Sequence, residues 1–104
     1  MKDFTIKNLQ SYLATVYPDI TEEELFFKLV DGLGSLAEII SIRLGRKRGQ
    51  TSDVDLGDEL AELIHYVVAL AAVNQIDLEE ILIAKDKEFS KKHNLNYNLS
   101  QFLE

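Results

Sequence analysis

Apolar residues recur along most of this chain at spacings of three and four positions, with polar residues between them. That period gathers apolar side chains on one face of an α-helix, and no segment shows the strict alternation expected of a half-buried strand. One proline and five glycines are the only strong interruptions. The sequence therefore predicts an all-helical fold made of four helices.

The first predicted helix runs from about residue 5 to residue 17, with Leu9, Leu13 and Val16 facing inward. Its end is set by Pro18, because proline disfavours helical geometry at the residue before it. We expect the chain to turn here into the second helix.

The second predicted helix starts at a capping-box pattern, in which Thr21 is followed three residues later by Glu24. It is expected to end near Gly45, where glycine can close a helix. Its apolar stripe consists of Phe26, Leu29, Val30, Leu33, Ala37 and Ile40. Gly32 and Gly34 lie inside this helix, where each costs about 1 kcal/mol against alanine, and this indicates a close helix approach or a local defect.

A polar, basic connection over residues 45–52 is expected to be exposed and to lead into a third helix that begins around Asp55. Between residues 60 and 73 almost every position except Glu62 and His65 is apolar or aromatic. A helix of this kind must be covered on most sides, which a small four-helix chain cannot do alone. We expect a homodimer or a dimer of dimers with this helix in the interface.

The fourth predicted helix starts with Asp77 as its N-cap and becomes basic toward residues 91–92, which suits both ends of the helix dipole. The tail over residues 93–104 keeps several apolar residues and is expected to dock on the helices or on a partner chain. We expect a single domain over residues 1–104, with its core in about residues 5–92.

The composition and net charge of the chain limit the classes of function that it can have. The net charge of −7 disfavours nucleic-acid binding, despite a local basic cluster of Arg43, Arg46, Lys47 and Arg48. The absence of cysteine excludes disulfides and thiolate chemistry and favours a reducing compartment, with the cytoplasm as the default. No apolar run approaches the ~20 residues that cross a bilayer, so we expect no membrane span.

Carboxylates are placed on two of these otherwise apolar helices. Asp31 and Glu38 share one helix face, and Glu59 and Glu62 share another, so antiparallel packing of the two helices would bring the acids together. Crowded carboxylates suit Mg²⁺ and, through it, a phosphate substrate. The alternative is that these are ordinary solvated acids on helix exteriors.

A family resemblance covers roughly residues 5–92. The run over 58–71, followed by 76–82 and Lys85, resembles the second half of MazG-like all-α nucleotide pyrophosphohydrolases, and residues 9–13, 27–30 and 34–38 resemble the first half. The resemblance implies a MazG-like four-helix bundle. It also implies Mg²⁺ held by an E-x-x-E motif and an E-x-x-D motif, and cleavage of nucleoside triphosphates to monophosphate and pyrophosphate.

The two motifs map unequally onto this chain. The second motif falls on Glu59 and Glu62, with glutamate in place of the usual aspartate at Glu62. The first falls on Gly32 and Ser35, and neither residue can be an anionic ligand. The nearest acids that could replace these two ligands are Asp31, one residue before Gly32, and Glu38, about one turn after Ser35. The candidate metal ligands are therefore Glu59, Glu62, Glu38 and Asp31.

Two basic residues are candidates for substrate binding. Lys85 matches a lysine of the family, and Arg46, in the basic cluster, could reach a triphosphate tail. A solvated surface role is the alternative for both. For His65, which has no second histidine at helical spacing, we expect a hydrogen-bonded core or interface role.

Three interpretations stay open at this point, and with them the question whether the protein is an enzyme. The first is a diverged, Mg²⁺-dependent pyrophosphohydrolase that uses Asp31 and Glu38. The second is a nucleotide binder without hydrolysis. The third is a non-catalytic homo-oligomeric assembly or partner-binding paralogue of that family.

Overall fold

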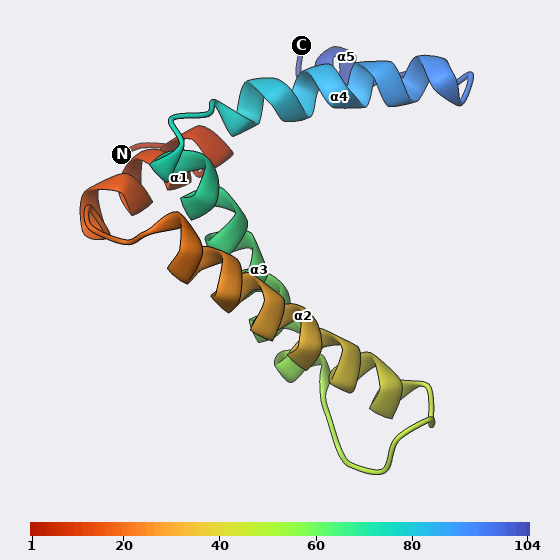
Figure 1. Cartoon of the computed structure of the whole chain (residues 1–104). Helices are drawn as coiled ribbons and strands as arrows, with labels where there is room; N and C mark the ends of the chain where they lie inside the picture. Colours follow the sequence, from red (N-terminus) through yellow and green to blue (C-terminus); the bar gives the residue numbers. More distant parts are fainter.

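A hairpin of two long helices forms the largest part of the fold. The computed structural model describes all 104 residues and contains helices but no strands. Helix α2 (Glu22–Arg43) and helix α3 (Asp53–Val73) run antiparallel and pack side by side along most of their length (Figure 1). The all-helical class predicted from the apolar period is confirmed.

Helix α1 (Ile6–Val16) closes one end of the hairpin, where it packs mainly on α3. The buried core lies at this junction and consists of Leu13, Leu25, Val68 and Ala69. Leu13 is buried and Leu9 half-buried, as expected, but Val16 stays 41% exposed. The inward assignment of Val16 is wrong because the contact made by α1 covers only its earlier turns.

The helix starts follow the capping residues closely. The Thr21 hydroxyl accepts a hydrogen bond from the Glu24 N–H and donates one to its carboxylate, both at 3.1 Å, and Asp77 caps α4. Both predicted starts are confirmed. Helix α3 begins two residues earlier than expected because Ser52 and Asp55 form a complete capping box.

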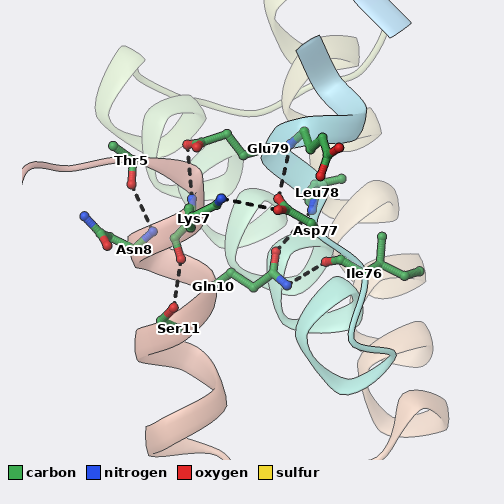
Figure 2. A network of polar contacts seen from close by, with 10 residues as sticks. Thr5, Lys7, Asn8, Gln10, Ser11, Ile76, Asp77, Leu78 and Glu79 are labelled. Carbon is green, nitrogen blue, oxygen red and sulfur yellow. Dashed lines mark hydrogen bonds and ion pairs between the residues drawn. The ribbon is translucent and has the colours of Figure 1, made fainter. Parts of the chain in front are cut away.

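Helix α4 (Leu78–Lys92) leaves the hairpin and is held at its base by polar contacts with α1 (Figure 2). The Gln10 side-chain amide donates to the carbonyl of Ile76 at 2.6 Å and accepts from the N–H of Leu78 at 3.4 Å. The ammonium of Lys7 lies 3.3 Å from the Asp77 carboxylate. These contacts fix the direction in which α4 departs.

The tail docks on α4 of its own chain through a short helix, α5 (Leu99–Phe102). The N–H of Leu99 donates to the Asp86 carboxylate at 2.6 Å, and the buried Ser90 hydroxyl donates to the Tyr97 carbonyl at 2.9 Å. Of the two expectations for this segment, docking within the chain is confirmed.

The molecule is not compact, and few of its side chains are buried. Its radius of gyration is 16.6 Å, against about 13 Å for a compact domain of this length. Only 8 of 104 residues are buried.

Most of the apolar stripe predicted for α2, which begins at Phe26, is exposed. The positions of α2 that turn inward are instead Leu25, Leu29, Gly32, Leu36 and Ile39. No helix combines the length and apolar character that crossing a membrane requires.

Candidate functional site

The two helices of the hairpin approach each other closely at Gly32. A Cβ atom at this position would stand 2.8 Å from Cδ2 of Leu63 and 3.3 Å from Oε1 of Glu59. The close approach expected at this glycine is confirmed. Gly34 has no neighbouring atom within 4 Å of the corresponding point, so of its two alternatives the close helix approach is wrong.

This approach sets the register of the hairpin. Gly32 occupies the position where the family resemblance places the first acid of one motif, and Glu59 is the first acid of the other. In the structure the two positions face each other across the helix pair. The space that a longer side chain would need is filled by Leu63 and by the Glu59 carboxylate.

Three of the predicted acids contribute negative charge at Tyr66. Burial is the largest cause that raises the pKa of the Tyr66 phenol, followed by the negative charges of Glu62, Glu59 and Asp31 in that order. Each charge opposes formation of the tyrosinate anion. Asp31, Glu59 and Glu62 therefore act on one common point between α2 and α3.

Glu38 does not belong to this group. Its carboxylate forms an ion pair at 2.9 Å with the ammonium of Lys47, in the connection that follows α2, and about half of each side chain is exposed. Exposed pairs of this kind contribute about 0–1 kcal/mol. The pair directs Glu38 toward the loop and gives its charge a local partner.

The donor set does not fit a magnesium ion within one chain. No three histidine, cysteine or carboxylate side chains converge at a point where they could hold a metal. Mg²⁺ demands near-octahedral oxygen coordination, and here one motif offers Glu59 and Glu62 while the other offers Gly32 and Ser35. The acids of one chain therefore do not form a complete magnesium site.

A cavity of about 410 Å³ lies between α1, the first turns of α2, and α3, and Glu62 is the one predicted acid that lines it. It is lined by Tyr12, Leu13, Tyr17, Ile20, Leu25, Lys28, Glu62, His65, Tyr66 and Ala69. Three of the four tyrosines of the chain are among them. The volume falls within the range of small-molecule sites, and Lys28 and Glu62 give the apolar walls one positive and one negative group.

Sequence reasoning missed most of this cavity. His65 is exposed and lines the cavity wall, so the core alternative for it is wrong, whereas the interface alternative stays a prediction. The available signal was Tyr66, which stands four residues after Glu62 and so shares its helix face. Nothing in the spacing of Tyr12 and Tyr17 connects them to a helix fifty residues away.

The two predicted phosphate-binding residues lie elsewhere in the chain. Lys85 is on α4, where its ammonium is 3.2 Å from the Glu88 carboxylate. Arg46 is in the exposed connection after α2. Neither residue lines the cavity.

Comparison with known proteins adds no family to this description. Neither family models, nor curated proteins, nor solved structures match the chain. Membership of the MazG-like group therefore stays a hypothesis, which depends on the motif residues and on the register of Gly32 and Glu59.

Proposed function

We propose that this chain is a diverged MazG-like nucleoside triphosphate pyrophosphohydrolase that binds a nucleotide between α1, α2 and α3 and hydrolyses it slowly. The proposal rests on the register of the hairpin, that is, on which residues of α2 and α3 lie opposite each other. Gly32 lies against Glu59, and this proximity supports the assignment of the two motifs to facing positions of α2 and α3.

The cavity beside this point has the chemistry of a nucleoside site. Its tyrosine rings offer faces on which a planar base can stack. Lys28 at the wall can pair with a phosphate oxygen. A nucleotide seated here would place its phosphates near Glu62, and toward Glu59 and Asp31.

Hydrolysis by this chain should be slow for a physical reason. Phosphate groups approach carboxylates only when a cation separates the negative charges, and this chain lacks two of the four acids that the family uses for Mg²⁺. Glu59, Glu62 and Asp31 are the residues that would contribute to such a site. Glu38 would first have to leave Lys47.

A pyrophosphate-release assay tests this function. The purified protein is incubated with a panel of nucleoside triphosphates and Mg²⁺, and pyrophosphate and monophosphate are quantified. We expect release that is slow and that disappears in Glu59→Gln, with Glu88→Gln on α4 as the matched control. The hydrolase is excluded if pyrophosphate release across the panel equals that of a protein-free blank.

A second candidate function, a non-catalytic homo-oligomeric assembly module, is favoured by the exposed surface. The chain exposes 8158 Å², whereas a compact monomer of 11.8 kDa exposes about 5,900 Å². The excess of about 2,200 Å² per chain is of the size that obligate homodimers bury. We propose that the MazG-like bundle is completed by a second copy in either case.

Light scattering coupled to size-exclusion chromatography tests the homo-oligomer. We expect the mass of a dimer or a tetramer at micromolar concentration. Oligomers that bind no nucleotide would favour the assembly module over the hydrolase, and a monomer at all concentrations would exclude both homo-oligomeric proposals.

A further inference from the structure

One part of the molecule has no partner for its apolar surface within its own chain. We call residues 78–104, which comprise α4, the tail and α5, the arm. Seven large apolar side chains of the arm are exposed: Ile81, Leu82, Phe89, Leu95, Tyr97, Phe102 and Leu103. An apolar surface of this extent on an elongated element marks a site of association.

The arm is held away from its own hairpin by specific contacts. Gln10 and Lys7 of α1 fix the first turn of α4 through the hydrogen bonds and the ion pair shown in Figure 2. The side chain of Asn74, between α3 and α4, donates to Glu22 at 3.0 Å and to the Leu70 carbonyl at 2.9 Å. The arm therefore has a set direction, and folding back onto its own α2 and α3 would break these contacts.

The hairpin carries a second uncovered apolar surface. Leu60, Ile64 and Val67 of α3 are exposed at helical spacing. Helix α2 adds Phe26, Phe27, Val30, Leu33 and Ile40. We call these eight residues the hairpin face. Within one chain, the fold keeps the arm away from the hairpin face. In a pair of chains, the arm of each copy can cover the hairpin face of the other.

Charge and length favour the same pairing. Helices α2 and α3 carry ten carboxylates and two cations, whereas residues 85–92 of the arm carry four lysines and two carboxylates. The outer half of α4 is thus positive and the hairpin strongly negative. Helix α4 is about 22 Å long and the hairpin helices about 32 Å, so the arm can lie along most of a hairpin.

We propose that two copies exchange arms, so that the arm of each packs across the hairpin face of the other. The inference rests on the homo-oligomer proposed above and adds the surface that makes it. Because the exchange is reciprocal, every contact occurs twice and the interface closes at two copies. The excess surface of each chain is enough to supply both halves of such an interface.

Site-directed photocrosslinking tests the exchange on the full chain. A benzophenone amino acid replaces Phe89, and unlabelled protein is mixed in denaturant with ¹⁵N-labelled protein, refolded and irradiated. Crosslinked peptides are identified by mass spectrometry, and the same sample is weighed by native mass spectrometry. The control carries the benzophenone at Phe4, an exposed aromatic position outside both surfaces.

We expect crosslinks from position 89 to peptides of residues 22–73, half of them joining a labelled chain to an unlabelled one. A dimer mass with crosslinks only to residues 78–104, or only within one chain, overturns the arm exchange and leaves the homo-oligomer standing. A monomer mass overturns both. As a second measurement, Phe89→Asp should raise the dimer dissociation constant at least tenfold, and Phe4→Asp should change it less than twofold.

Discussion

The carboxylate of Glu59 lies over Gly32, with Oε1 only 3.3 Å from the point where any other residue would place its Cβ atom. Glycine is therefore the residue that lets α2 and α3 approach with the carboxylate folded between them. The proposed MazG-like function would require an acid at this position as a metal ligand, and glycine cannot supply one.

Alanine at the two glycines inside α2 should have opposite effects on stability. Gly34→Ala should raise the free energy of unfolding by about 0.5–1 kcal/mol, because the new methyl group meets open space and alanine favours the helix. Gly32→Ala should lower it by about 1 kcal/mol, because its methyl group would overlap Leu63. Urea unfolding at one fixed protein concentration measures both, and equal effects would contradict the close packing at Gly32.

Restoring the missing motif should create dependence on magnesium. The double variant Gly32→Glu, Ser35→Glu places one further carboxylate against Glu59 and a second one about one turn along α2, so we expect its Tm to fall without divalent cations. Mg²⁺ should then raise its Tm more than that of the parent protein, since an ion that binds only the folded state stabilises it. The placement of the motif is wrong if Mg²⁺ shifts both Tm values equally.

The charges around Tyr66 should be visible in its titration. Since Glu62 is the largest charge that raises the Tyr66 pKa, Glu62→Gln should move this pKa down toward its ordinary value of 10.0. Ultraviolet titration of the phenolate, with Tyr66→Phe to identify the step, measures the shift. Glu38→Gln is the control and should leave the titration unchanged, because the Glu38 carboxylate pairs with Lys47 instead.

The contacts that hold the first turn of α4 should weaken at low pH. The backbone N–H of Glu80 is the largest cause that lowers the Asp77 pKa below 3.8, and Lys7 adds to it. A lowered folded-state pKa means that the ionised carboxylate stabilises the fold above its unfolded pKa. This stabilisation is lost as pH falls through the folded pKa.

Hydrogen exchange of the first α4 amides, followed from pH 5 to pH 2, measures this effect. Protection in the parent protein, corrected for intrinsic exchange rates, should fall below pH 4. Asp77→Asn keeps a capping side chain without the charge, so its protection should change less over the same range. Identical profiles for the two proteins would show that the Asp77 charge does not hold the arm.

The helices could be predicted from the sequence because their start signals act locally. The site was harder to predict because it depends on contacts between residues far apart in the sequence. Thr21 and Asp77 marked helix starts because a capping side chain acts on amides three residues away. Helix α2 is apolar on more than one side, so its period could not tell which stripe meets α3 and which stays exposed.

The acids of the site show the same limit. Glu59 and Glu62 share a helix face by spacing alone, and Tyr66 is one turn further on. The pairing of Glu38 with Lys47 depends on how the connection after α2 folds back, which no helical period encodes. Tyr12 and Tyr17 reach the cavity only because α1 crosses the end of the hairpin.

The nucleotide proposed for the cavity beside Glu62 should change the amide chemical shifts of the residues that line this cavity. A ¹⁵N-labelled sample is titrated with nucleoside triphosphates, with and without Mg²⁺. We predict saturable shifts concentrated at Lys28, Glu62 and Tyr66, and weaker binding in Tyr66→Ala than in the control Tyr97→Ala. Nucleotide binding in this cavity is excluded if the chemical-shift changes are confined to the basic connection around Arg46, or if no nucleotide causes any change.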